Sequence, residues 1–551
     1  MENELLNLGE AMQAEYLTKQ LIQMPSYNGT DSEKEKGKYL YKLIQSFPYF
    51  QENKDAVWIQ PLKEDGRLNV WALLEGKGSS KNTIIYHAHM DTVGIEDYGG
   101  IKNIAHDPES LASFFKTCDS ELEASADAKS GEWMFGRGAL DMQSGISVHL
   151  VNLLYYTNHL EELEGNLLVL FNVDEENQHT GIRGALEELV RLQKEKGLNY
   201  VSAINNDFIS PLYNGDNTKY IYCGGAGKLL PCFSIFGREA HVGESLLGVD
   251  PTLVASEINR LINQNFALTE DIDGELVLPP SCLYMKENKQ SYDVQTPVST
   301  RLYFNYFIYK KTPSEVISSL KGLTEQATIT IEKLLKDNFL AYCKQNKLPT
   351  RDINWNIEVV TLKEYMEYLS KEGLEPELVM NELLNELPKN MDDRLRAFEM
   401  VEALQRLDPQ KKPRVILFLA APFLPSNTLQ EDSQSLQIKQ AVSDALLEAE
   451  KNMNEKFCLR KYFPYLCDGS FLGFHGDKAE IEAVRTNFPG MDTFFPLDLE
   501  TMNALNIPAF NIGVYGKGGH KWTERVYKPY TFHKLPLLIR SITGKILNSL
   551  A

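Results

Sequence analysis

Side chains of the types that bind metal ions recur in five short groups along the chain. The groups are His87-Ala88-His89-Met90-Asp91, 136–141 ending in Asp141, Asp174-Glu175-Glu176, Asn205-Asn206-Asp207, and 516–520 ending in His520, with Glu524 soon after. Imidazole nitrogen and carboxylate oxygen together suit zinc, and two ions need about six protein contacts with one shared carboxylate. The pattern therefore predicts a site for two divalent metal ions, with zinc favoured and cobalt or manganese as the alternatives.

The elements around these groups predict a mostly parallel sheet. Apolar β-branched runs alternate with helical patterns between residues 80 and 225, which is typical of strands joined by crossover helices. Strands are expected over 83–86, 167–173, 201–204 and 508–514, and helices over 145–156, 184–194 and 535–550. In such sheets ligands bind beyond the carboxyl ends of the strands, which is where most of the metal-binding groups fall.

The middle of the chain follows a different pattern. Strand-like runs at 229–236, 299–309 and 415–420 are separated by helices expected over 250–265 and 313–345. The second helix begins with Thr312, Pro313 and Glu315, the residues of a capping box with proline in the first turn. Residues 346–412 are charged and helix-favouring, so we expect a helical insertion there.

The length of the chain requires more than one hydrophobic core. Single cores stop growing at roughly 250–300 residues, and this chain has 551. We expect a catalytic domain formed by residues 1–224 and 422–551. A second domain over 225–421, which carries the insertion, interrupts it.

Composition narrows the class of partner and the cellular location. The formal net charge of −20 repels phosphate backbones and anionic lipid, so neither nucleic acid nor a membrane is expected as a partner. Early acidic residues and the lack of a long apolar stretch argue against a signal peptide or a membrane span and for a cytoplasmic protein. The seven cysteines are scattered, odd in number and without a Cys-x-x-Cys pair, so free thiols are expected.

At these motifs the chain resembles a known family, the co-catalytic zinc amidohydrolases and peptidases that include aminoacylase, succinyl-diaminopimelate desuccinylase and carboxypeptidase G. The resemblance covers nearly the whole chain. It rests on His89-Met90-Asp91, 136–142, Asp174-Glu175-Glu176, Asp207 and His520, in family order. It implies an α/β fold with a zinc-peptidase-like, mostly parallel sheet flanked by helices, and an inserted α+β lid or dimerisation domain. Residues 86–94 and 519–525 resemble most closely a branch of the family connected with arginine catabolism.

The resemblance also implies a division of the metal ligands between two sites. Asp141 would bridge the two ions. His89 and Asp207 would complete one site, and Glu176 and His520 would complete the other. The ions would cleave an amide or peptide bond of a small substrate.

Three further residues receive roles from the same resemblance. Asp91 would hold the imidazole of His89 in the metal-binding tautomer. Glu175 would act as the general base that takes a proton from the attacking water and delivers it to the leaving nitrogen. His241, in the second domain, would reach the active site of a partner subunit and stabilise the oxyanion, which implies a homodimer.

The substrate stays open at this point. The arginine that grips the substrate carboxylate in many family members is missing; Arg301 is a nearby substitute, whereas Asp293 favours a cationic group such as guanidinium. Dipeptides, N-acyl amino acids and N-carbamoyl amino acids are all compatible with the motifs. The alternative outside the enzyme class is a non-catalytic metal-binding or regulatory protein that retains the fold. A phosphate-binding enzyme is excluded, because 224–229 lacks the glycine offset and the Ser or Thr of a phosphate-binding loop.

Overall fold

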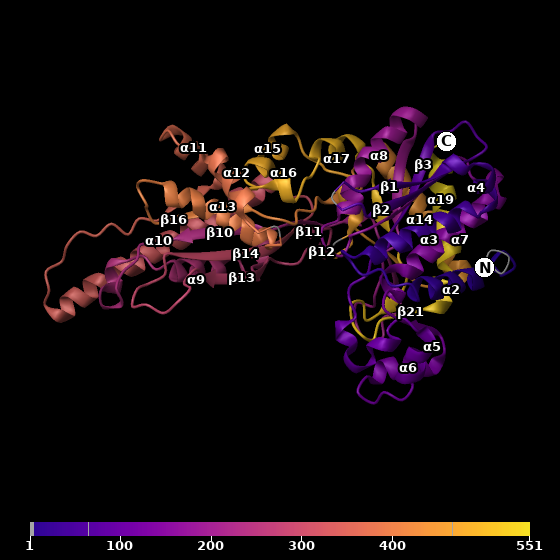
Figure 1. Ribbon diagram of the computed structural model, residues 1–551, viewed down its shortest axis with the longest axis horizontal. Coiled ribbons are helices and arrows are strands. Elements are labelled where there is room, and N and C mark those ends of the chain that lie inside the picture. Colours follow the sequence, from indigo (N-terminus) through magenta and orange to yellow (C-terminus); the bar gives the residue numbers. More distant parts are fainter. Residues whose placement is uncertain (1–4, 64, 389, 466, 551) are drawn as a thin grey trace. The chain divides into compact units, whose positions relative to one another are not determined.

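The computed structural model describes residues 5–63, 65–388, 390–465 and 467–550, and the chain divides into two compact units. The first contains Met1–Gly225, Asn427–Phe474 and Thr501–Ala551, and the second contains Ala226–Ser426 and His475–Glu500 (Figure 1). Residues 475–500 thus cluster with the second unit, whereas the sequence prediction groups them with the first. The domain boundaries expected from the sequence stay a prediction.

An eight-stranded sheet forms the centre of the first unit. Its order is β1 (Val57–Pro61), β2 (Leu68–Glu75), β5 (Asn166–Asn172), β3 (Asn82–His89), β6 (Asn199–Asn205), β19 (Ala509–Asn511), β7 (Lys219–Tyr222) and β18 (Phe457–Arg460). Strands β5, β3, β6 and β19 run parallel, and β1 and β2 add an antiparallel edge. The expected α/β fold and its strands are confirmed, although the last predicted strand is shorter than 508–514.

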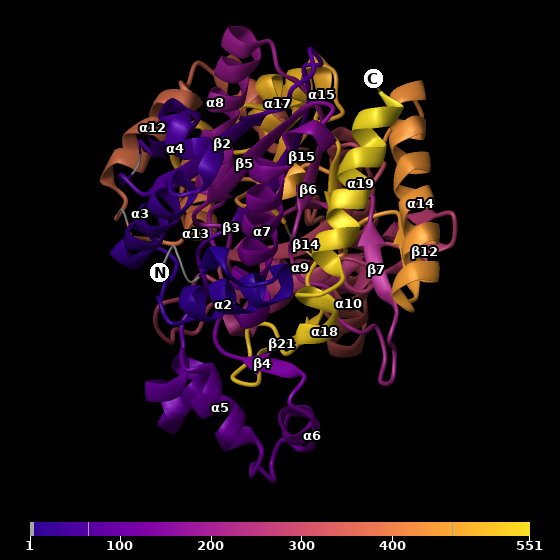
Figure 2. The ribbon, with the colours of Figure 1, turned by 90° about the vertical axis from the view of Figure 1, so that its right-hand side faces the viewer.

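Helices cover this sheet with their apolar faces. Helices α7 (Ser144–Asn158) and α19 (Leu535–Ser549) contact β3, and α8 (Thr180–Lys196) contacts β2. Figure 2 shows α7, α19 and α14 (Ser433–Met453) side by side. In α8 the buried residues recur every three or four positions, at Ile182, Ala185, Leu186, Leu189 and Leu192, so one stripe faces the core.

A small separate core lies between β3 and Asp141 in the sequence. It is built from η2 (Glu96–Ile104), α5 (Pro108–Phe115), α6 (Leu122–Ser130) and β4 (Trp133–Phe135) around buried Leu111, Phe115 and Phe135. Strand β4 pairs with β21 (Arg525–Tyr527), and Trp522 packs against Phe115 with ring centroids 5.2 Å apart. This packing holds the segment before Asp141 beside the segment that follows His520.

The second unit has its own six-stranded sheet. Its order is β13 (Ser281–Glu287), β14 (Ser299–Ile308), β10 (Pro231–Phe236), β16 (Arg414–Leu419) and β15 (Glu358–Thr361), with β9 (Gly227–Leu229) also paired to β14. Helices α9 (Pro251–Ile262) and α10 (Pro313–Asn346) match the predicted helices, and the capping box of Thr312 and Glu315 is present.

The predicted helical insertion is only partly helical. It contains α11 (Leu362–Lys371), α12 (Pro376–Glu386) and α13 (Asp393–Leu407), but also strand β15, which extends the sheet parallel to β16. Within the described ranges, no helix combines the length and the apolar character needed to cross a membrane.

Candidate metal centre

The carboxyl ends of three neighbouring parallel strands bring the predicted site residues to one edge of the first unit's sheet. His89 is the last residue of β3 and lies opposite Asn172, the last residue of β5. The turn after β5 carries Glu175 and Glu176, and Asp207 follows the end of β6. Parallel strands point their carboxyl ends the same way, so residues distant in the sequence meet there.

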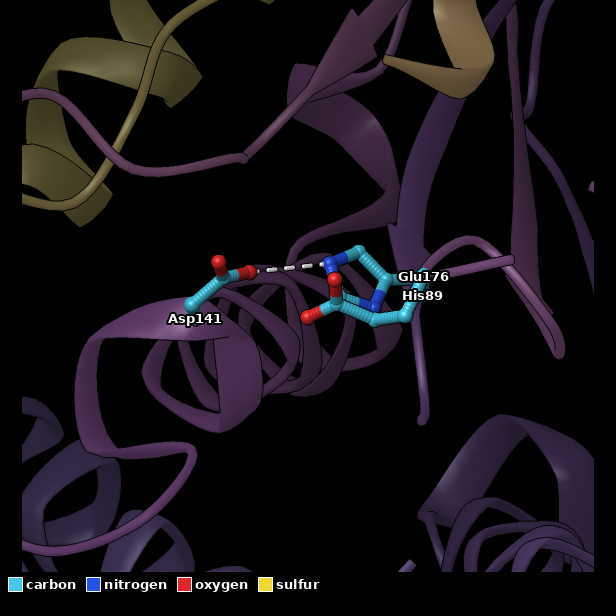
Figure 3. Close-up of side chains that lie close together, drawn as sticks. All are labelled: His89, Asp141 and Glu176. Atoms are coloured by element: carbon cyan, nitrogen blue, oxygen red, sulfur yellow. Dashed lines mark hydrogen bonds and ion pairs between the residues drawn. The ribbon is translucent and has the colours of Figure 1, made fainter. Parts of the chain in front are cut away.

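Asp141 lies between two histidines. Its Oδ1 is 3.1 Å from Nε2 of His89, and its Oδ2 is 3.0 Å from Nε2 of His520. His520 Nε2 is also 2.9 Å from Oε1 of Glu176. Ligand-type atoms of His89, Asp141 and Glu176 all lie within 4.8 Å of one another, and Figure 3 shows their polar ends converging. Each oxygen of the Asp141 carboxylate thus faces a different imidazole, as a bridging ligand requires.

Asp207 lies close enough to this group to interact with it electrostatically. Its side chain is buried. Burial and the Asp141 and Glu176 carboxylates raise the pKa of Asp207 to about 8, against the opposing effect of His89. Crowded buried carboxylates are unfavourable without a compensating cation. Two imidazoles and three carboxylates fit divalent ions of the zinc type by their donor chemistry.

Asp91 contacts more than His89. Nδ1 of His89 lies 3.1 Å from the backbone carbonyl oxygen of Asp91 and 3.4 Å from its Oδ1. The Asp91 carboxylate also accepts hydrogen bonds from the backbone N–H groups of Glu175 and Glu176, both at 3.1 Å, and from Nδ2 of Asn28 at 2.9 Å. Asp91 therefore orients both a histidine and the turn that carries the two glutamates.

Glu175 lies beside the cluster without being hydrogen-bonded to it. Its Oε2 is 4.0 Å from Nε2 of His89, and its side chain is 10% exposed. Burial raises the pKa of Glu175 well above its ordinary value, and the charges of Asp468 and Glu176 add to this effect while His89 opposes it. A carboxyl group whose pKa is raised is better suited to accept a proton than one with an ordinary pKa.

A buried ion pair fixes the backbone at Asp141. Oε1 of Glu524 accepts hydrogen bonds from the N–H groups of Leu140 and Asp141 at 3.0 and 3.1 Å. Its Oε2 lies 2.7 Å from Nη1 of Arg137, and both side chains are 1% exposed. The sequence placed Arg137 and Glu524 inside two metal-binding groups but suggested no role for either, because nothing local indicates that they meet.

His241 belongs to the second unit. It is exposed, and its Nδ1 accepts a hydrogen bond from the N–H of Gly243 at 3.1 Å.

Arg301 and Asp293, the residues expected to bind a substrate carboxylate or guanidinium, form ion pairs within the second unit. Arg301 pairs with Glu399 and Glu402 of α13 at 2.6 and 2.7 Å. Asp293 pairs with Lys289. Neither Arg301 nor Asp293 is therefore a free charge.

Comparisons with known proteins agree with this geometry. Residues 85–210, which include His89, Asp141, Glu176 and Asp207, match the model of Peptidase family M20/M25/M40. Protein RocB of Bacillus subtilis (strain 168) is 49% identical over 549 residues, covering 99% of this chain and 97% of RocB. YqjN of the same organism is 33% identical over 527 residues, covering 94% and 93%.

The fold is also similar to that of a solved structure. The M20 family metallo-carboxypeptidase Sso-CP2 of Sulfolobus solfataricus superimposes with a TM-score of 0.51 at 12% identity, covering 98% of this chain and all of that one. The family match and the whole-length similarity to RocB together establish that the chain belongs to peptidase family M20/M25/M40 and is a metal-dependent hydrolase.

Proposed function

We propose that this protein hydrolyses an amide or peptide bond of a small substrate, such as an N-acyl amino acid or a dipeptide, using two divalent ions. His89, Asp141, Glu176, Asp207 and His520 would hold the ions, and zinc is the metal that the donor set favours. The observation that carries the proposal is the position of Asp141, whose two oxygens face His89 and His520 at 3.1 and 3.0 Å.

The roles of the neighbouring residues follow from their positions. Bound divalent ions would lower the pKa of a water molecule and polarise the scissile carbonyl. Glu175 accepts a proton from the attacking water and returns it to the leaving nitrogen. Its buried carboxyl, with a raised pKa, supports this role. Asp91 orients His89 and the turn that carries Glu175 and Glu176, because it contacts the His89 imidazole and the N–H groups of both glutamates.

The second unit is proposed to form a homodimer and to deliver His241 to the partner subunit's site. Support comes from β13, an edge strand of the six-stranded sheet. Leu276, Leu278, Leu283 and Met285, on and before this strand, are 40% to 61% exposed. An exposed apolar edge strand favours pairing with a second chain.

The biological setting is part of the proposal. A role in arginine catabolism rests on the sequence resemblance at residues 86–94 and 519–525, and a cytoplasmic location rests on the composition. The resemblance calls for N-acyl and peptide derivatives of arginine among the substrates that are tested.

The proposal is tested by metal analysis together with a Glu175→Gln variant. Elemental analysis of wild-type protein dialysed against a low concentration of zinc should find about two tightly bound ions per chain. Glu175→Gln should keep these ions and lose about 10²–10⁴-fold of turnover, because general-base catalysis typically contributes that much. Glu195→Gln, at an exposed glutamate of α8, is the control and should behave as wild type.

Three outcomes would contradict parts of this assignment. Fewer than two bound ions would contradict the ligand set. Loss of metal from Glu175→Gln would show that Glu175 is a ligand in place of Glu176. Two bound ions without turnover of any N-acyl amino acid or dipeptide would favour a non-catalytic metal-binding protein.

A further inference from the structure

A second group of metal-ligating side chains adjoins the metal centre. Ligand-type atoms of Glu175, His179 and Asp468 lie within 4.8 Å of one another, separately from the group of His89, Asp141 and Glu176. None of the roles proposed above uses His179 or Asp468. This group contains one imidazole and two carboxylates, a donor set that suits zinc-type ions.

The fold holds His179 in one orientation. Its Nδ1 lies 2.7 Å from Oδ1 of Asp468, and its backbone N–H donates to the carbonyl of Asp174 at 2.7 Å. The imidazole packs against Phe471 with ring centroids 5.0 Å apart. His179 has a φ of +54°, which a non-glycine residue adopts at a cost. The imidazole is therefore fixed before any ligand arrives.

Asp468 is fixed from its other side. Its Oδ2 accepts a hydrogen bond from Nδ2 of Asn172 at 2.5 Å, and Oδ1 of Asn172 lies 2.7 Å from Nε2 of His87. Asn172 ends β5, so the central sheet itself positions this carboxylate. Asp468 and His179 are 1% and 4% exposed.

The Glu175 carboxylate is the member of the group that accepts no hydrogen bond from the described residues. Its side chain is nine-tenths buried, yet no hydrogen bond to its carboxylate oxygens is found among the residues that the structure describes. A buried carboxylate without a hydrogen bond is destabilising unless it is protonated or meets a cation. The charge of His89 lies 4.0 Å from Oε2 of Glu175, and Glu175 also offers a ligand atom within 4.8 Å of His179 and Asp468. This buried carboxylate without a hydrogen bond is the observation that points to a ligand there.

The local charge points the same way. Six acidic side chains gather at this edge of the sheet, all of them buried or nearly so: Asp91, Asp141, Glu175, Glu176, Asp207 and Asp468. Two divalent ions balance four of their formal charges when all six are ionised. A third divalent ion would balance the remaining two.

We propose that Glu175, His179 and Asp468 form a third divalent-metal site, and that an ion bound there inhibits the enzyme. The His179 imidazole would bind the third ion through Nδ1, which would give up its hydrogen bond to Asp468. The third ion binds more weakly than the other two, because it must replace that bond and is repelled by two nearby cations. The proposed inhibition rests on the proposed function, because the third ion removes Glu175 from proton transfer. The proposed binding of the third ion does not depend on that function.

Metal stoichiometry tests the site without reference to activity. Wild-type protein is dialysed against rising Zn²⁺ or Co²⁺, and bound metal is measured by elemental analysis; the content should rise from about two to about three ions per chain. The His179→Asn variant should stop at about two. Asparagine tolerates a positive φ, and its amide can still donate to Asp468. His159→Asn, at a part-buried histidine that stacks on Tyr155, is the control and should keep the third ion.

Activity at rising metal tests the consequence. As the third ion binds, wild-type turnover should fall about 10²-fold or more, the size of a lost general base. The activity of His179→Asn, relative to its own value at low metal, should not fall over the same range.

Wild-type protein that saturates at two ions, or His179→Asn protein that keeps a third, would overturn the site. The wild-type isotherm alone decides the question if the variant fails to fold. A third ion that leaves wild-type activity intact would overturn the inhibition. Saturation below two ions would instead contradict the proposed function.

Discussion

Asp141 depends on partners from a distant part of the chain. Glu524 holds the N–H groups of Leu140 and Asp141 while it neutralises buried Arg137. Mutation of a residue that orients a metal ligand typically costs about 10–100-fold in metal affinity or activity. At the scale of single residues, we therefore expect the buried pair of Arg137 and Glu524 to position Asp141 for its proposed role as the bridging ligand.

A Glu524→Gln substitution should weaken metal binding about 10–100-fold. Glutamine has one acceptor oxygen, so its amide nitrogen must face either Arg137 or the N–H groups of Leu140 and Asp141, and both are donors. Chelator competition measures the affinity, and Glu132→Gln, at an exposed glutamate, is the matched control. Equal metal affinity for wild type and Glu524→Gln would show that this contact does not position Asp141.

Sequence reasoning could propose the candidate metal-binding side chains because most of the groups follow apolar runs of the predicted sheet and because their motifs resemble a known family. It could not propose their supports. Asn28 lies 63 residues before Asp91, and Arg137 lies 387 residues before Glu524, so only tertiary packing brings these residues together. His179 and Asp468 are 289 residues apart, so nothing in the sequence indicates that they meet.

Strand β15 depends on a buried arginine of its neighbour β16. Arg414 lies 2.8 Å from Glu358 of β15 and 2.5 Å from Asp408, just after α13. Its guanidinium also lies over the ring of Tyr365 of α11, 4.4 Å from the centroid. One side chain thus connects two strands with two helices, which explains how a four-residue strand persists among helices.

Replacing Asp408 with asparagine should destabilise the second unit by about 3 kcal/mol at neutral pH, the lower end for breaking a buried ion pair, because Glu358 still pairs with Arg414. Burial would raise the pKa of Asp408, but the hydrogen bond and charge of Arg414 hold it below its ordinary value. A carboxylate with a lowered pKa in the folded state stabilises the fold above its unfolded-state pKa of about 4. That contribution disappears as pH falls through the folded-state pKa.

Urea unfolding at neutral and acidic pH measures both effects. The difference between wild type and Asp408→Asn should be largest near pH 7 and should shrink below about pH 4. Asp352→Asn, at an exposed aspartate, serves as the control. A difference that grows as the pH falls would contradict the assignment of this stability to the ionised Asp408.

Elements with strong periodicity or capping signals were predictable. The capping box at Thr312 and Glu315 marked the start of α10, and buried runs marked β3, β5 and β6. Strand β15 was not predicted, because Glu358–Thr361 lies in a charged stretch and becomes a strand only by pairing with β16. Strands β1 and β2 were also not predicted, because they precede the region where strands and helices alternate and join the sheet in the antiparallel direction. This was a miss, since β2 is an apolar run buried at every residue but the last.

At the scale of the whole molecule, activity should require two chains. If His241 acts from the partner subunit, His241→Ala should lower kcat about 10²–10³-fold and leave the metal content unchanged, because one oxyanion donor contributes about that much. Mixed with Glu175→Gln protein, it should form hybrid dimers with one complete active site. Activity should then reappear in a mixture of two inactive proteins. Subunit exchange verified by mass, without recovery of activity, would show that His241 acts within its own chain or not at all.

The position of β19 has a consequence for how the protein is made on the ribosome. Residues 509–511 form an inner strand, between β6 and β7. In the sequence, Asp207 follows β6 and His520 follows β19. Because domains generally fold as units during synthesis, the sheet of the first unit cannot be completed until residues 509–511 have been translated. Until then the nascent protein lacks His520, one of its proposed metal ligands, and holds apolar strand edges that a chaperone would need to shield.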